Sequence, residues 1–433
     1  MESPPWSRRS GRPVAEAAKV QAKVLYLIGQ FPAINHSYLL AEVRHLRSLG
    51  LEVPVVSISP PDRPLEKLSP VEREEAARTY CVRAVPAAQV AMLNLGEFFR
   101  HPLCYLRGLT FAMRLAGGSP KQLGYHLAYF AEAILVGLRM REYGVSHVHA
   151  SFSATVALLV ARTFPVTMSF AVYGFGELHD PVGSHLPERI EGALFVRSIN
   201  KHGRGQLMLS CPRSEWPKLI YFPLGIDAAE FTLGPTRTVS SPPRLLCVGR
   251  LAPEKGQALL LEAIAALSAE GRPVRLQLVG DGPDRLWLES RAAGLGIASN
   301  VEFAGWVDQA GLMALYSEAD LFVLPSLAEG IPMVLMEAMA MEIPCVAPRI
   351  TGIPELIEHG VDGMLFAVAD VEDLTQQIRN LLESPELSAK IGKQARARVV
   401  RDYDMARNTE RFAAALARFL SMSARSQNPN EIL

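Results

Sequence analysis

Two acidic and two basic residues in the C-terminal half have the types and spacing to hold a phosphorylated ligand that bears hydroxyls. Glu329 and Glu337 lie on either side of a predicted helix start at Pro332, and Arg250 and Lys255 share the segment GRLAPEKG. A carboxylate accepts paired hydrogen bonds from the vicinal hydroxyls of a sugar. An arginine spans two phosphate oxygens, and a lysine adds a point charge. Taken alone, each pair is equally consistent with ordinary solvated charges.

These residues need elements that bring them to one place. The apolar run 321–324 is typical of a strand, 325–330 of a tight loop and 331–341 of a helix, and the predicted strand 244–248 ends just before Arg250. The free amides and the dipole of a helix start favour a phosphate, and only Pro332 lacks a donor. Loops that follow parallel strands meet at one edge of a sheet, so we expect both charged loops there.

Strands and helices alternate along most of the chain, which predicts an α/β fold with two Rossmann-like parallel sheets. The segment 231–244 is rich in Pro, Ser and Thr and marks a domain boundary. We expect a leader over 1–19, an N-terminal domain over 20–232, a C-terminal domain over 243–400, and a crossover helix and tail over 401–433. The crossover helix should dock on the body through one apolar stripe, formed by Met405, Thr409, Phe412, Leu416 and Phe419.

Composition excludes several classes of protein. The 433 residues carry 44 basic and 44 acidic side chains, which argues against a dedicated nucleic-acid binder. The five cysteines have neither disulfide-framework nor zinc-site spacing, which favours a reducing, cytoplasmic setting. Arg8 and Arg9 are not followed by the apolar core of an export signal, and no run approaches the ~18 apolar residues of a membrane span. Any contact with the inner face of a membrane would be peripheral.

The segment 81–145 interrupts the alternation with a long helical pattern. It holds seven basic residues against three acidic ones, and Arg107 and Arg114 fall on one helical face. Two interpretations remain open: a surface for anionic lipid, or a solvated helix edge packed on its own domain.

Polar side chains also gather after strands of the N-terminal half. Tyr173 and Glu177 lie on the glycine-bearing loop YGFGELHD after the strand 166–172, where this architecture places active sites. His147 and His149 share one side of a strand, and without a third ligand a hydrogen-bonded or packed pair is favoured over a metal site.

The glycines of VGDGPDR invite a comparison with dinucleotide-binding loops. Gly280 and Gly282 lack the third glycine and the later acid of such a fingerprint, so hydride transfer is poorly supported.

Five motifs in order within the second half resemble the retaining, nucleotide-sugar-dependent glycosyltransferases of the GT-B fold, family four. The matching text is VGRLAPEKG, LVGDGP, VEFAGWV, SEADLFVLPSLAEGIPMVLMEAMA and TGIPELIEHGVDGMLF. The first half is similar, more weakly, to the members that assemble exopolysaccharide and colanic-acid-type repeat units, through GQFPAINHSYLLAEVRHLRSLG, HVHASFS, SFAVYGFGEL and FPLGIDAAEF. The resemblance implies two Rossmann-like domains facing a cleft, with the C-terminal helix docking back on the N-terminal domain.

The resemblance also implies roles for individual residues. Arg250 and Lys255 would neutralise the donor diphosphate, Glu329 would contact the transferred sugar, and Glu337 would hold the ribose. Tyr173 completes the expected catalytic set. The remaining donor-binding residues would be Gly249, Gly280, Gly282 and Gly330 with the backbone amides of Met333 and Val334, and the acceptor side would include Gly29, His36, His149 and Glu177. No metal and no cofactor are implied, because cations and a helix dipole would stabilise the leaving diphosphate.

Two residues depart from the pattern of many relatives. Tyr173 replaces a histidine near the donor sugar, and His36 replaces a glutamate of the first loop. The predicted function is transfer of a hexose from a nucleoside-diphosphate sugar to a glycan or lipid-linked acceptor, in exopolysaccharide or cell-surface polysaccharide synthesis. The alternative is a catalytically silent nucleotide-sugar-binding module within a polysaccharide assembly complex, which the change at Tyr173 alone supports.

Overall fold

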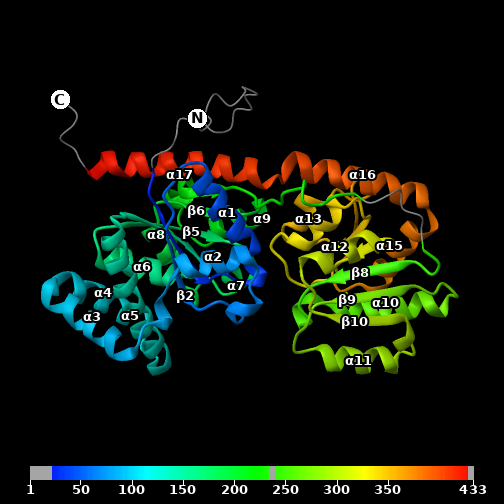
Figure 1. Cartoon of the computed structure of the whole chain (residues 1–433), viewed down its shortest axis with the longest axis horizontal. Coiled ribbons are helices and arrows are strands. Elements are labelled where there is room, and N and C mark those ends of the chain that lie inside the picture. The colour runs from blue at the N-terminus through cyan, green and yellow to red at the C-terminus, as the bar shows by residue number, and fades with distance from the viewer. Residues whose placement is uncertain (1–21, 234–239, 428–433) are drawn as a thin grey trace.

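Two parallel β-sheets, each covered by helices, lie side by side in the computed structural model, which describes residues 22–233 and 240–427 (Figure 1). The predicted leader and most of the segment between the domains lie outside the described residues. The first sheet has the strand order β3-β2-β1-β4-β5-β6-β7 and the second β10-β9-β8-β11-β12-β13. The two Rossmann-like sheets are as predicted.

The first sheet and its helices occupy residues up to Tyr221. Its strands are β1 Leu25–Gln30, β2 Val55–Ser59, β3 Tyr80–Cys81, β4 His147–Ser151, β5 Thr167–Val172, β6 Val196–Ser198 and β7 Leu219–Tyr221. Its α-helices are α1 Ser37–Ser48, α2 Pro70–Arg78, α3 Ala87–Arg100, α4 Pro102–Leu115, α5 Pro120–Tyr143, α6 Ala154–Thr163, α7 Phe175–His179, α8 Leu186–Gly192 and α9 Lys201–Leu209.

The second sheet begins at Arg244. Its strands are β8 Arg244–Val248, β9 Arg275–Val279, β10 Val301–Gly305, β11 Leu321–Val323, β12 Cys345–Pro348 and β13 Met364–Phe366. Its α-helices are α10 Gln257–Ala269, α11 Arg285–Gly294, α12 Gln309–Glu318, α13 Met333–Ala340, α14 Ile353–Leu356, α15 Val371–Glu383, α16 Pro385–Asp402 and α17 Met405–Gln427.

The strands are apolar because helices cover both faces of each sheet. Leu25 to Ile28 of β1 are fully buried, and so are Leu321 to Val323 of β11. All strand pairs are parallel, which requires the helical crossovers that the alternating sequence predicts.

Each sheet reverses its winding direction once. The order changes between β1 and β4 in the first sheet and between β8 and β11 in the second. Ligands of open α/β sheets bind at such switch points, outside the carboxyl ends of the strands. The loops that carry Arg250, Lys255 and Glu329 follow β8 and β11, so they flank the switch point of the second sheet.

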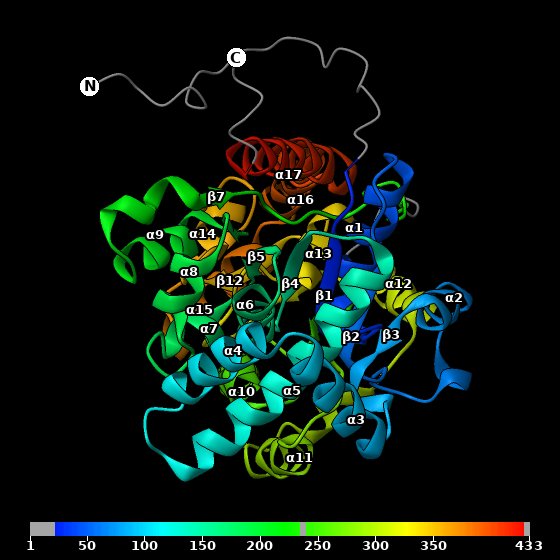
Figure 2. The same ribbon diagram turned by 90° about the vertical axis from the view of Figure 1, so that its left-hand side faces the viewer.

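The helices α3, α4 and α5 fill most of the predicted helical segment 81–145 and form a layer on the outer side of the first sheet (Figure 2). None of the helices in the described ranges is long and apolar enough to cross a membrane.

The last two helices connect the domains. α16 packs on α13 of the second domain, and α17 continues across the molecule to α1 of the first domain (Figure 1). Of the predicted stripe, Thr409, Phe412 and Leu416 are buried. The docking of the C-terminal helix on the N-terminal domain is therefore confirmed.

Candidate functional site

An ion pair joins the two charged loops of the second domain. Lys255 Nζ lies 2.7 Å from Glu329 Oε1, and the hydroxyl of Ser326 donates to the same oxygen over 2.7 Å. The Glu329 side chain is only 9% exposed, so its charge depends on these two donors. The sequence places these residues 74 positions apart, and the fold brings them into contact.

Backbone contacts hold the same two loops together. The amides of Leu327 and Ala328, after β11, both donate to the carbonyl of Glu254, after β8, over 2.8 and 3.3 Å. Gly256 has a φ of +65°, and a Cβ there would lie 2.2 Å from the carbonyl oxygen of Pro325. This glycine therefore permits the close approach that aligns Lys255 with Glu329.

The start of α13 lies directly after this pair and offers free amides. The first turn is closed by the amide of Leu335, which donates to the carbonyl of Pro332 over 3.2 Å. The amides of Met333 and Val334 therefore have no partner within the helix. The helix start and Lys255 together favour an anion at this position.

Glu337 lies one turn further along α13. It accepts a hydrogen bond of 2.9 Å from the hydroxyl of Tyr316, and burial raises the pKa of its carboxyl group. Tyr316 thus fixes one oxygen of Glu337.

Arg250 is exposed, while its backbone carbonyl accepts a hydrogen bond of 2.9 Å from Gln257. Gly280 has a φ of +125°, and a Cβ there would lie 2.1 Å from the carbonyl oxygen of Gly249. A Cβ on Gly282 would meet the carbonyl of Leu251 in the same way, at 2.2 Å. Packing between the loops after β8 and β9 therefore accounts for Gly280 and Gly282 without any ligand.

The first domain meets the donor loop through the segment after β5. A Cβ on Gly330 would lie 2.0 Å from the carbonyl oxygen of Tyr173, so only glycine allows the two backbones to touch. The loop that begins with Tyr173 therefore lies against the loop that carries Glu329.

The side chain of Tyr173 points into an aromatic stack. Its hydroxyl lies 2.9 Å from Ser151 Oγ, and burial raises its pKa, so the phenol stays neutral. Phe152 stacks on both Tyr173 and His36, with ring centroids 4.9 and 4.5 Å apart. Phe152 has a φ of 63° and is 41% exposed. Phe152 lies within the motif HVHASFS, but only its position directly after β4, at the switch point, indicates a role for this residue.

The remaining acceptor-side residues lie at different depths. A Cβ on Gly29 would lie 3.2 Å from Phe152 Cβ, so Gly29 borders the stack, and His36 is part of it. His149 is fully buried and packs on Phe412 of α17, in the core and not in the cleft. Both His149 and His147 bond to the hydroxyl of Ser169 over 2.8 Å, which matches the favoured interpretation of a hydrogen-bonded pair.

Glu177, on α7, carries an incompletely satisfied carboxylate. Its nearest cation, Arg189, lies 3.7 Å away, and its second oxygen has no hydrogen-bond partner within the described part of the chain. Burial raises the pKa of Glu177 to about 7 against the opposing charge of Arg189.

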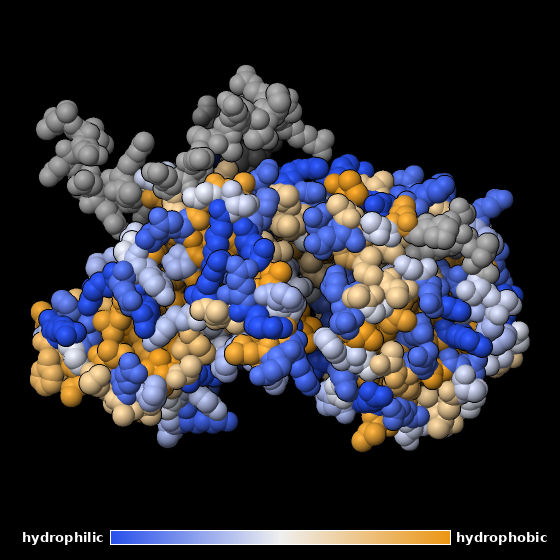
Figure 3. Space-filling model, in the orientation of Figure 1, coloured by the Kyte–Doolittle hydropathy of each residue, from blue (hydrophilic) through white to orange (hydrophobic). Residues whose placement is uncertain are grey.

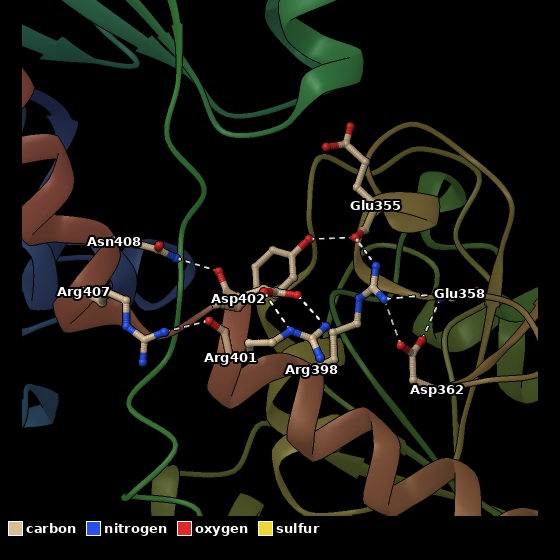
Figure 4. Close-up of polar contacts among 9 residues, drawn as sticks. Glu355, Glu358, Asp362, Arg398, Arg401, Asp402, Arg407 and Asn408 are labelled. Atoms are coloured by element: carbon tan, nitrogen blue, oxygen red, sulfur yellow. Dashed lines mark hydrogen bonds and ion pairs between the residues drawn. The ribbon is translucent and has the colours of Figure 1, made fainter. Parts of the chain in front are cut away.

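The side chain of Glu355 links the two domains directly. Both oxygens of Glu355, from α14, accept backbone amides at the start of α9: Lys201 over 2.9 Å and His202 over 2.8 Å. The carbonyl of Glu355 accepts from Arg398 and from the hydroxyl of Tyr403, beside the junction of α16 and α17 (Figure 4). Sequence patterns do not reveal this contact, because its partners are backbone groups 153 and 154 positions away.

Two Rossmann-like domains that face each other, joined by a C-terminal helix that docks back on the first, have the architecture of the GT-B fold. Residues 233–398 match the family described as Glycosyl transferases group 1, so the second domain is similar to the glycosyltransferases of this group.

Similar proteins cover between about half and most of the chain. A protein named for colanic acid biosynthesis, glycosyltransferase WcaL of Escherichia coli (strain K12), is 26% identical over 419 residues, which are 88% of this chain and 96% of the relative. The amylovoran biosynthesis glycosyltransferase AmsK of Erwinia amylovora is 31% identical over 204 residues, 46% of this chain and 49% of the relative. Among solved structures, Anabaena Alr3699/HepE in complex with UDP has a TM-score of 0.67 at 17% identity, covering 91% of this chain and 99% of that chain.

Proposed function

We propose that the chain transfers a hexose, with retention of anomeric configuration, from a nucleoside-diphosphate sugar to a glycan or lipid-linked acceptor. The proposal places this reaction in the cytoplasm, in the synthesis of an exopolysaccharide or other cell-surface polysaccharide. The observation that carries it is the Lys255–Glu329 ion pair beside the free amides of α13. The names of WcaL and AmsK support the polysaccharide class, and the UDP bound to the Anabaena protein supports a nucleotide donor.

The geometry suggests how the donor would be held. The diphosphate would lie at the start of α13, against the amides of Met333 and Val334. Lys255 has three N–H donors, of which Glu329 takes one, so the ammonium group has donors for a phosphate oxygen, which would compete with Glu329 for its positive charge. Arg250, whose side chain is exposed, would close over the other phosphate. Glu337 would accept from the ribose through the oxygen that Tyr316 leaves free.

The chemistry then requires little proton transfer by the protein. The bond between the anomeric carbon and the phosphate oxygen breaks as the acceptor hydroxyl attacks from the same face. The hydroxyl proton passes to the departing phosphate oxygen. The negative charge that develops on the diphosphate lies against Lys255, Arg250 and the helix start, so electrostatic stabilisation and positioning supply most of the rate.

The acceptor would approach from the first domain. The loop after β5 touches Gly330, and the stack of His36, Phe152 and Tyr173 lies at the switch point of the first sheet. The Tyr173 hydroxyl is bonded to Ser151, so this residue would shape the wall of the site and leave proton transfer to the substrates.

The test is turnover with defined donors. Purified protein would first be screened by thermal shift against UDP-, GDP- and ADP-hexoses, since a ligand stabilises the fold in proportion to its binding. The stabilising donor would then be incubated with lipid and glycan extracts, and nucleotide release and the anomeric linkage of the product would be measured. Binding without nucleotide release in any extract would contradict the proposal.

Removal of metal ions tests separately whether the protein's own groups stabilise the leaving diphosphate. Because Arg250, Lys255 and the α13 amides are proposed to stabilise the diphosphate, EDTA treatment should leave turnover within about twofold. A loss restored by Mg²⁺ or Mn²⁺ would show that a divalent cation carries part of this role.

A further inference from the structure

The hairpin of α3 and α4 exposes an unusual number of large apolar side chains. Phe99 is 72% exposed and Leu103 is 82% exposed. With their exposed neighbours they form the α3–α4 apolar face, made of Met92, Leu95, Phe99, Leu103, Leu106 and Met113. The space-filling view shows hydrophobic side chains gathered over this hairpin (Figure 3). Their spacing of three, four or seven residues places them along one stripe of each helix.

The inward side of α4 is already packed. Gly108 and Ala112 are buried, and a Cβ on Gly108 would lie 2.1 Å from Thr163 Oγ1 and 2.8 Å from the ring of Phe130. The helix therefore sits as close to α5 and α6 as its backbone allows. The exposed leucines belong to a second, outward stripe that has no apolar partner among the residues that the structure describes.

The same region carries an excess of positive charge. Residues 98–131 contain no Asp or Glu, while Arg100, Arg107, Arg114 and Lys121 recur every seven positions and are all exposed. The acids that flank this stretch are already paired: Glu97 with Arg141 and Glu132 with Arg83, each over 2.9 Å. These four exposed cations, here called the cation row, lie on α3, α4 and the start of α5 without ion-pair partners among the described residues. Arg107 also donates to the carbonyl of Arg162 over 2.7 Å.

Apolar side chains beside an unneutralised row of cations match the interface of an anionic bilayer. We propose that the α3–α4 apolar face docks on a membrane surface rich in anionic lipid, with Phe99 and Leu103 entering the headgroup boundary and the cations meeting lipid phosphates. A second copy of the chain fits less well, since a two-fold interface here would set the cation row against its symmetry mate. Nucleic acid would engage the cations but leave the protruding Phe99 and Leu103 in water.

The inference stands apart from the transfer reaction, because no residue of the face belongs to the proposed site. The test is flotation of the full chain with two kinds of vesicle, phosphatidylcholine alone and phosphatidylcholine with 30% phosphatidylglycerol. The protein should float with the anionic vesicles only, and raising the ionic strength should weaken the binding.

Two double variants separate the contributions. Phe99→Ser with Leu103→Ser should weaken vesicle binding at least about tenfold, because two apolar side chains no longer leave water. Arg100→Gln with Arg114→Gln should weaken it about 25-fold, from roughly fivefold per cation near an anionic surface. Both changes lie at exposed positions, so the urea unfolding curve should stay unchanged.

Matched controls lie on the other domain. Leu286→Ser with Trp287→Ser, on α11, and Lys390→Gln with Lys393→Gln, on α16, remove exposed side chains of the same kinds and should leave flotation unchanged. Absence of flotation in the wild-type protein, or equal losses in test and control variants, would overturn the proposal. So would a concentration-dependent dimer, seen by light scattering, that the Phe99 and Leu103 changes abolish, since the face would then bind a second copy.

Discussion

At the residue scale, Lys255 and Glu329 pair with each other but would bind different parts of the donor. The pair neutralises itself across 2.7 Å while no donor is bound. A diphosphate would compete with Glu329 for the ammonium group, whereas a sugar hydroxyl would compete with Lys255 for the carboxylate. The two residues should therefore separate donor binding from turnover when they are changed one at a time.

We expect Glu329→Gln to lower kcat by about 10²–10³, the usual cost of losing one preorganised polar contact at a reacting centre. Affinity for the nucleoside diphosphate should not weaken, because Lys255 loses its competitor. Lys255→Ala should weaken nucleotide binding as well as turnover. Titration calorimetry with the nucleoside diphosphate and initial rates distinguish the two patterns. Glu254→Gln, an exposed acid beside Lys255, serves as the control, and wild-type turnover in Glu329→Gln would contradict the site.

Glu177 predicts a specific dependence of stability on pH. Its pKa is about 7 in the folded protein, above the ordinary value of 4.5, so the folded state retains a proton that the unfolded state releases. Its contribution to stability is therefore full below about pH 4.5 and is lost as pH rises to 7. Urea unfolding of wild type and Glu177→Gln should show the variant gaining relative stability over this range, by about 3 kcal/mol at most. A constant difference between the two proteins would show that Glu177 titrates normally.

The sequence predicts the donor side of the site better than the acceptor side. Arg250, Lys255, Glu329 and Glu337 follow from charge, spacing and family motifs, and the fold joins Lys255 to Glu329. The surroundings of Tyr173 do not follow, because its hydroxyl partner and its stacking partners come from other loops. The same limit applies to His149, whose burial depends on α17, far along the chain.

At the scale of elements, the first turn of α9 holds a carboxylate from the other domain. Asn200 caps the helix by accepting the amide of Gly203, which leaves the amides of Lys201 and His202 for Glu355. Both hydrogen bonds are charge-assisted and lie at the positive end of the helix dipole. The contact therefore stabilises the arrangement in which the two domains approach each other.

Glu355→Ala should shift the equilibrium between approached and separated domains by about 2 kcal/mol, or roughly 30-fold, towards separation. Small-angle scattering should report a larger radius of gyration, and the KM for the donor should rise. Glu358→Ala changes a nearby exposed carboxylate that does not reach α9, so it is the matched control. If the scattering curve of Glu355→Ala is unchanged, the contact does not control the distance between the domains.

The hairpin of α3 and α4 shows that sequence patterns can predict a helix without predicting which of its faces is buried. Apolar spacing and charge counts predict the helices of 81–145, but they do not say which stripe faces inward. Small residues decide this: Gly108 and Ala112 let α4 approach α5 and α6 closely, and the larger leucines remain outside. Such close packing depends on the shape of Thr163 and Phe130, which lie far away in the sequence.

At the scale of the whole molecule, two connections between the domains run side by side. Ile226, on the way to the second domain, and Asp404, on the way back, form a parallel bridge. Its hydrogen bonds join the amide of Ile226 to the carbonyl of Tyr403 over 3.0 Å and the amide of Met405 to the carbonyl of Ile226 over 3.1 Å. Asn408 ties α17 to the same junction (Figure 4). These hydrogen bonds therefore hold the two connections together at this point between the domains.

Because α17 completes the core of the first domain, a change within it should destabilise that domain and spare the second. Phe412 is fully buried, its ring lies near those of His149, Phe195 and Phe222, and the guanidinium of Arg197 lies 4.2 Å from its centroid. Phe412→Ala should cost about 3–5 kcal/mol, from lost burial and the cavity that remains. Unfolding in urea should then begin in the first domain.

Met422→Ala, at an exposed position on the same helix, should stay within about 0.5 kcal/mol of wild type and controls for helix propensity. The second domain should remain folded in Phe412→Ala at intermediate urea, with its nucleotide site intact, because Lys255 pairs with Glu329 inside that domain and α13 packs on α16. Proteolysis at that urea concentration, with and without nucleotide, tests whether the second domain is still folded and still protected by its ligand. Simultaneous loss of both domains would instead show that the crossing helix couples their unfolding into one transition.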